Sequence, residues 1–146
     1  MNCYNTYVCG PDKAILKLHK NLRKAESSIL IQLRTGKVGL ARFLCKRRVP
    51  GYGSPRCRCG RGVGTPVHFL LQCDIYAEQR RRGFGDLSRR TFRDLIDSPE
   101  LVAVAAKWAI RTGELQQFEL ASRLLYGEGS EQRGERDREG SREGVG

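Results

Sequence analysis

The sequence predicts an all-α domain, a small bundle of about five helices with a zinc-knuckle loop inserted into it. Apolar residues recur at helical spacings of three and four over most of residues 12–126, and no stretch alternates as a half-buried strand does. A Gly- and Pro-rich loop that carries cysteines interrupts this pattern near its middle. We therefore expect three segments: an irregular lead-in (1–11), a helical zinc-binding domain (12–126) and a disordered charged tail (127–146), whose residues are too polar to form a core.

The first helical segment begins after Asp12, which suits an N-cap, and carries an apolar stripe from Ile15 to Leu33. One long helix or two consecutive helices fit this stripe equally well. Gly36 is expected to end the segment with a left-handed C-cap.

Two further helices flank the loop. One is expected over 38–48 and ends before Pro50, and the other runs over 66–82 until Gly83 and Gly85 break it. The residues of these two helices that are expected in the core are Leu40, Phe43, Leu44, Phe69, Leu70 and Ile75.

The last part of the domain predicts a short helix over 91–97 and two longer ones. The helix over 99–112 follows an N-cap serine and a first-turn proline, and it has a face of small residues. The final helix, over 115–125, presents an apolar face made by Phe118, Leu120, Ala121, Leu124 and Leu125.

The loop carries the strongest chemical signal. Cys57, Cys59, His68 and Cys73 give the order Cys-x-Cys-x8-His-x4-Cys, and Thr65 is placed to cap the helix that bears the last two. Buried cysteines can be plain small apolar residues, and this spacing lacks one residue of the common Cys-x2-Cys form. However, three of the six cysteines and one of the two histidines fall in this window. The cluster predicts one structural Zn²⁺ with three thiolates and one imidazole.

The net charge of +11 is concentrated around this loop. Residues 34–93 contain fifteen basic and three acidic residues, and arginine predominates. Because guanidinium groups bind phosphates in bidentate fashion, this bias predicts a nucleic-acid partner held through its phosphates. The residues expected to contact it are Arg34, Lys37, Arg42, Lys46, Arg47, Arg48, Arg56, Arg58, Arg61, Arg80, Arg81 and Arg82.

Two runs of the chain carry a resemblance to a known family. Residues 18–28 (LHKNLRKAESS) and 32–40 (QLRTGKVGL), followed by the cysteine knuckle, resemble the C-terminal end of reverse transcriptases from fungal non-LTR (LINE-type) retrotransposons. The resemblance covers residues 12–126 and implies a nucleic-acid-engaging zinc module that other domains of such a polyprotein accompany. The paired aspartates of a polymerase and the carboxylates of an RNase H domain are absent from this sequence, so the resemblance implies a detached module.

The sequence predicts no enzyme, because four N/S ligands leave a zinc ion no open position for water and few acidic groups lie near the cluster. It shows neither a signal peptide nor an apolar membrane span, which favours reduced thiols and an intracellular protein, nuclear or cytoplasmic. Two alternatives to nucleic-acid binding stay open. The helix over 99–112 and the final helix could dock onto a partner protein, or the chain could be a retrotransposon remnant without a selected role.

Overall fold

The computed structural model describes residues 13–86 and 89–127. Within these ranges the chain is mostly helical and has no strand, which confirms the predicted fold class. Asp12, the lead-in and residues 128–146 of the predicted tail lie outside the described residues. The α-helices are α1 (Lys13–His19), α2 (Lys24–Thr35), α3 (Ala41–Lys46), α4 (Ala77–Phe84), α5 (Phe92–Asp97), α6 (Val102–Arg111) and α7 (Glu119–Tyr126).

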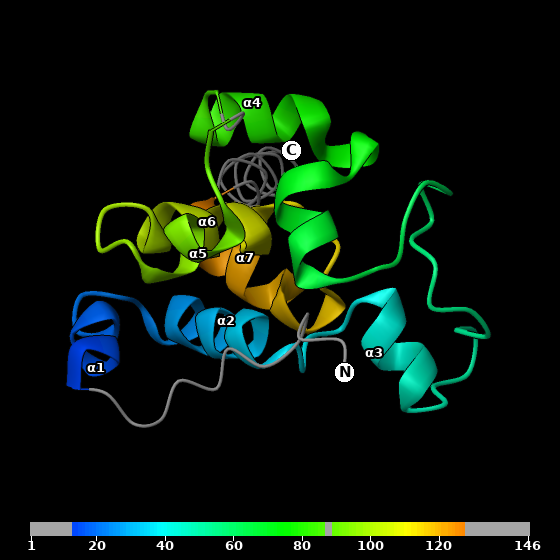
Figure 1. Cartoon of the computed structure of the whole chain (residues 1–146). Coiled ribbons are helices and arrows are strands. Elements are labelled where there is room, and N and C mark those ends of the chain that lie inside the picture. The colour runs from blue at the N-terminus through cyan, green and yellow to red at the C-terminus, as the bar shows by residue number, and fades with distance from the viewer. Residues whose placement is uncertain (1–12, 87–88, 128–146) are drawn as a thin grey trace, which may run out of the picture.

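Helix α6 is the centre of the bundle and packs against α2, α4, α5 and α7. In Figure 1 it lies between α4 above and α2 below. Ala105, Ala106 and Ala109 are fully buried on it, because small side chains let neighbouring helices approach closely. The small-residue face of this helix is therefore part of the core and is not available to a partner protein.

The observed bounds of several helices can be compared with the predicted ones. The apolar stripe is divided into two helices, α1 and α2, and Gly36 ends α2 with φ 70°, as predicted. Helix α3 is shorter than expected because Leu40 is still extended and serves as its N-cap. Helix α6 also begins late, at Val102, because residues 98–101 form a turn.

The expected continuous helix over 66–82 is the main correction. A π-helical turn over His68–Gln72 ends at Cys73, whose ψ of 124° turns the chain away, and a 3₁₀ turn then leads into α4. Gly83 lies inside α4, and the helix ends at Gly85. The break also rotates Ile75 outward, where it is 43% exposed, so its assignment to the core is wrong.

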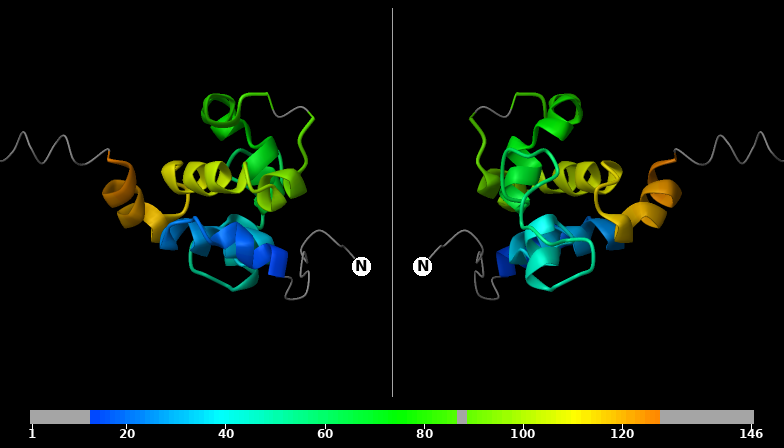
Figure 2. Two further views of the ribbon diagram at one scale, coloured as in Figure 1. Left: turned by 90° about the vertical axis from the view of Figure 1, so that its left-hand side faces the viewer. Right: turned by 90° about the vertical axis from the view of Figure 1, so that its right-hand side faces the viewer.

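Helix α7 leaves part of its predicted apolar face exposed. It extends from the edge of the bundle in the side views (Figure 2), and Leu120 and Leu124 are each 66% exposed. Its anchor is Tyr126, whose hydroxyl donates to Glu26 Oε1 at 2.6 Å.

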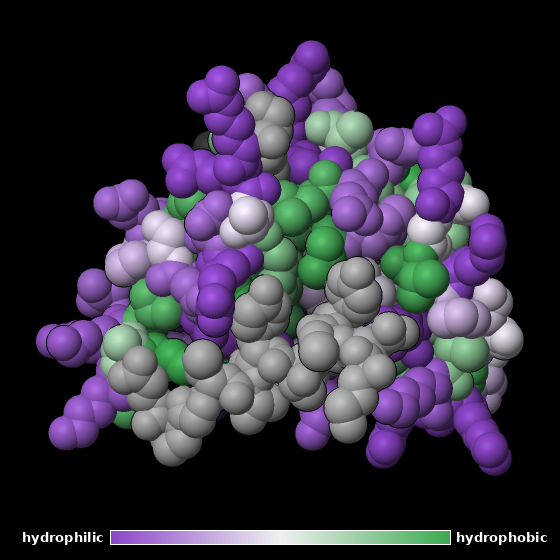
Figure 3. Space-filling view, viewed as in Figure 1, coloured by the Kyte–Doolittle hydropathy of each residue, from purple (hydrophilic) through white to green (hydrophobic). Residues whose placement is uncertain are grey.

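Hydrophilic side chains project around much of the outline of the face in Figure 3. No helix among the described residues is long and apolar enough to cross a membrane.

Candidate metal centre

A hairpin-like loop presents the first two cysteines. The backbone N–H of Cys57 donates to Gly62 O at 2.8 Å, and Arg56 and Val63 form an isolated antiparallel bridge beneath it. Gly60 turns the loop with φ 77°, a conformation that is costly for residues with a Cβ atom. The turn brings Cys57 and Cys59 to the same end of the loop.

The second pair of candidate ligands comes from the π-helical turn. Thr65 Oγ1 accepts from the backbone N–H of His68 at 3.2 Å, as an N-cap does, and Cys73 N–H donates to His68 O at 2.7 Å. In a regular α-helix two residues five positions apart point about 140° away from each other. The i→i+5 turn brings His68 and Cys73 onto the same side, which explains why this segment departs from α-helical geometry.

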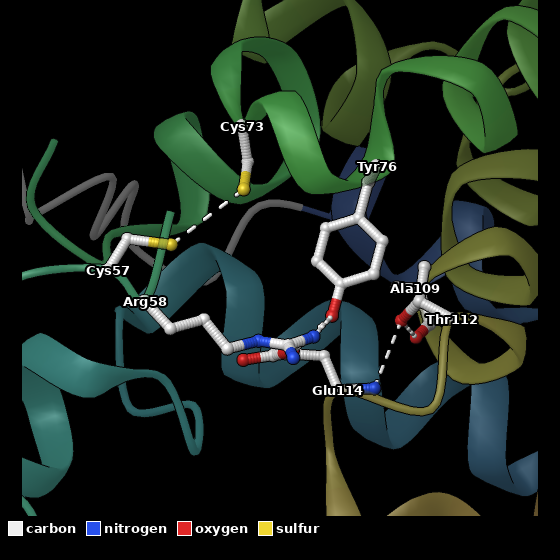
Figure 4. Close-up of polar contacts among 7 residues, drawn as sticks. All are labelled: Cys57, Arg58, Cys73, Tyr76, Ala109, Thr112 and Glu114. Atoms are coloured by element: carbon white, nitrogen blue, oxygen red, sulfur yellow. Dashed lines mark hydrogen bonds and ion pairs between the residues drawn. The ribbon is translucent and has the colours of Figure 1, made fainter. Parts of the chain in front are cut away.

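The four side chains converge on one point. Their ligand atoms lie within 4.8 Å of one another. Cys57 Sγ is 3.7 Å from Cys73 Sγ, and Cys59 Sγ is 3.2 Å from His68 Nε2. Figure 4 shows the sulfurs of Cys57 and Cys73 directed at each other across the gap between loop and turn. The structure therefore brings together all four predicted ligands in an arrangement able to hold one metal ion.

The thiols differ in their electrostatic surroundings. Burial raises the pKa of Cys57 to about 11. The pKa of Cys59 is lowered, first of all because the backbone N–H of Arg61 donates to its sulfur at 3.4 Å. A cation bound among these groups would supply the charge that stabilises several thiolates at once. Cys45 lies outside the cluster, and Cys3 and Cys9 are outside the described residues.

Arg80 supports the cluster from behind, in a role that the sequence did not suggest. It is 9% exposed, and its guanidinium donates to three carbonyl oxygens, those of Leu70 (2.8 Å), Cys73 (2.9 Å) and Phe69 (3.2 Å). The break at Cys73 leaves these carbonyls at a helix end, where they need donors. Arg80 supplies them, so its predicted contact with nucleic acid is wrong.

A polar network joins the loop to the C-terminal part of the bundle. Arg58 Nη2 donates to Tyr76 Oη at 2.7 Å and to Glu114 Oε2 at 2.9 Å, and Tyr76 also donates to Glu114. Figure 4 shows the three side chains meeting below the cluster. Glu114 precedes the last helix and lies far from the loop in sequence, so no local pattern could have identified it.

Four other cations line a groove beside the cluster of candidate metal ligands. The groove has a volume of about 300 Å³ and lies between the end of α2 and α3, and the segment 64–66 forms one of its walls. The cations that border it are Lys37, Arg42, Lys46 and Arg47. No acidic residue lines this groove, and none of the four forms an ion pair within the described part of the chain. Their positive charge is therefore uncompensated.

The remaining predicted phosphate contacts fall into three groups. Arg48 and Arg56 are exposed and have no acidic partner among the described residues. Arg34 is 8% exposed and donates to Ile96 O at 2.7 Å and to Asp97, so its predicted role at the surface is wrong. The four that are exposed but ion-paired are Arg58 with Glu114, Arg61 with Asp74, and Arg81 and Arg82 with Glu78.

No protein-family model, characterised protein or solved structure matches this chain at a significant level.

Proposed function

We propose that the chain is a zinc-stabilised nucleic-acid-binding module that holds phosphates in the groove beside its metal cluster. The observation that carries this proposal is the group of four uncompensated cations in one groove, Lys37, Arg42, Lys46 and Arg47. Nucleic-acid phosphates are acceptors that such a groove attracts at long range and binds at close range. Arg48 and Arg56 extend the cationic surface.

The donor set favours zinc as the metal. Three thiolates and an imidazole suit Zn²⁺, whereas Ca²⁺ and Mg²⁺ prefer oxygen ligands. With Zn–S bonds of about 2.3 Å, the edge of a tetrahedron between two sulfurs is about 3.8 Å. The 3.7 Å between Cys57 Sγ and Cys73 Sγ fits this edge. Four protein ligands complete the shell, so we assign the ion a structural role and the chain no catalytic activity of its own.

The metal and the groove share backbone. Gly64, at the end of the cysteine loop, accepts a hydrogen bond from the backbone N–H of Arg42 at 3.2 Å, and 64–66 also forms one wall of the groove. The metal holds the loop from which this wall extends. Loss of the metal should therefore loosen α3 and disperse the cations that bind phosphate.

The resemblance to the C-terminal region of retrotransposon reverse transcriptases supports the same proposal. A module of this kind acts inside the cell, on RNA or DNA, and cooperates with the other domains of its polyprotein. The test is the salt dependence of binding to a 20-nucleotide single-stranded RNA, measured by fluorescence anisotropy of the zinc-loaded chain. Six phosphate contacts predict a slope of log K against log[salt] of about −4 to −5.

Lys46→Gln with Arg47→Gln should weaken binding and reduce the magnitude of that slope by about 1.4–1.8 units. The matched control is Arg81→Gln with Arg123→Gln, which removes the same amount of charge from side chains that already pair with Glu78 and Glu119. It should change the slope much less. Equal effects of both pairs, or no binding by the parent chain, would refute the proposal.

A second function, docking to a protein partner, is favoured by one observation. Leu120 and Leu124 are each 66% exposed on the same face of α7. An apolar contact there would hardly respond to salt, whereas the phosphate contacts respond steeply. Binding to a protein partner that survives 0.5 M salt in Lys46→Gln with Arg47→Gln, but is lost in Leu124→Glu, would support this alternative.

A further inference from the structure

A second basic groove lies between α4 and α6, on residues that the function proposed above does not use. Its volume is about 520 Å³, within the range of small-ligand sites. Arg82 borders it from α4, where it also pairs with Glu78, and Lys107 and Arg111 border it from α6. None of the residues that line it is acidic. The groove therefore combines the size of a ligand site with positive charge from two helices.

A buried donor without a partner lies at this groove. Trp108 lines it and is 7% exposed, and its indole Nε1 has no hydrogen-bond partner. A buried indole N–H usually has an acceptor, since burying it unpaired is costly. The only other buried side-chain nitrogen without a partner in the described ranges is Arg34 Nε, whose guanidinium is otherwise bonded. The Trp108 N–H therefore lacks the hydrogen-bond acceptor that a buried indole usually has.

The side chains packed around the Trp108 indole limit which ligand groups can accept a hydrogen bond from its N–H. Trp108 is surrounded by Phe69, Tyr76 and Phe84, with ring centroids 5.3, 6.1 and 5.3 Å away. A ligand ring therefore cannot stack on the indole. Gly83 passes beside the N–H edge, where an added Cβ would lie 2.7 Å from Trp108 Cδ1 and 3.4 Å from Nε1. The N–H edge of the indole therefore lies against the Gly83 backbone at the wall of the groove, and Nε1 itself is covered in the structure.

We propose that this groove binds a phosphate group, with one oxygen accepting from Trp108 Nε1–H and the others facing the cations. Lys107 and Arg111 lie one turn apart on α6 and are both exposed, and Arg82 faces them from α4. Guanidinium groups match the oxygens of phosphate in bidentate geometry. Because Nε1 is covered in the structure, the oxygen reaches it only when the residues around the groove move aside. The phosphate comes either from a free polyphosphate or from a nucleic-acid backbone.

The test uses the single tryptophan of the chain as its own reporter. The zinc-loaded chain is titrated with inorganic pyrophosphate and, separately, with a twelve-nucleotide thymidine oligomer, and the emission of Trp108 is recorded. Sodium chloride of matched ionic strength is the blank. We expect a saturable change with at least one probe and none with the blank. A response to pyrophosphate identifies free phosphate as the source, and a response to the oligomer alone identifies the backbone.

Variants separate this site from the groove beside the metal. Lys107→Gln with Arg111→Gln should weaken the saturable response at least tenfold, while Lys46→Gln with Arg47→Gln should leave the pyrophosphate response unchanged. Circular dichroism and zinc content confirm that each variant is folded. The proposal is overturned if neither probe saturates, or if the response persists undiminished in Lys107→Gln with Arg111→Gln. Either result leaves the salt-slope test of the nucleic-acid function intact.

Discussion

Arg80→Met tests the assignment of a buried arginine as the support of the metal-binding turn. Methionine retains most of the aliphatic length but removes every donor. The carbonyl oxygens of Phe69, Leu70 and Cys73 then lose the hydrogen bonds that the guanidinium donates at 3.2, 2.8 and 2.9 Å. Because Cys73 is a candidate ligand, the change should weaken both the fold and the metal site.

The magnitude follows from the three bonds. Hydrogen bonds to a charged group contribute about 1.5–3 kcal/mol each, and removing the donor leaves buried acceptors without partners. Relief from burying the guanidinium charge offsets part of this loss. We therefore expect the free energy of unfolding to fall by about 2–4 kcal/mol in Arg80→Met.

Urea unfolding of the zinc-loaded chain, followed by circular dichroism, measures this change. Arg81→Met is the matched control, since Arg81 is 74% exposed and pairs with Glu78 on its own helix. The control should lose far less stability. If Arg80→Met is as stable as Arg81→Met but binds RNA less tightly, Arg80 contacts phosphate, and the structural role argued for it is wrong.

Three further predictions concern the metal and two side-chain contacts. Cys73→Ser should reduce bound zinc from about one per chain to near zero by mass spectrometry, whereas Cys45→Ser should keep it; equal loss in both contradicts the ligand set. Tyr126→Phe removes the hydrogen bond to Glu26 and should cost about 1–2 kcal/mol in urea unfolding, and an unchanged midpoint would mean that this bond does not anchor α7. The backbone N–H of Thr91, before α5, holds the pKa of Asp94 below its ordinary value. The charged form of Asp94 therefore stabilises the fold above that ordinary pKa, and this effect is lost as the pH falls through the lowered pKa. Asp94→Asn should therefore lower the unfolding midpoint at pH 6 and converge with the parent in acid; a constant difference contradicts this.

Local patterns in the sequence were enough to predict the helical class and which four side chains cluster as candidate metal ligands. Apolar spacing identified α2 and α6, because helical periodicity is a property of consecutive residues. Thr65 and Thr91 cap helices as their side chains suggest. The candidate ligands could be identified because cysteine and histidine are scarce in the chain and gather within one window.

Whether each arginine is buried or exposed depended on the tertiary structure instead. Arg34 and Arg80 belong to the same basic stretch as Lys46 and Arg47, and nothing in their neighbours along the chain sets them apart. Arg34 is buried because Ile96 and Asp97, more than sixty residues away, offer it acceptors. Whether a charged side chain is buried or faces solvent depends on which distant acceptors the fold brings within hydrogen-bonding distance.

The same distinction explains the metal-binding turn and the last helix. An α-helical pattern over 66–82 does not show that the chain must turn at Cys73 to aim a thiol beside His68. The apolar stripe of α7 also does not show whether another helix covers Leu120 and Leu124, which are exposed in the structure. Periodicity and ligand identity are set by residues close in sequence, whereas burial, ion pairing and the break at Cys73 arise only when segments distant in sequence pack together.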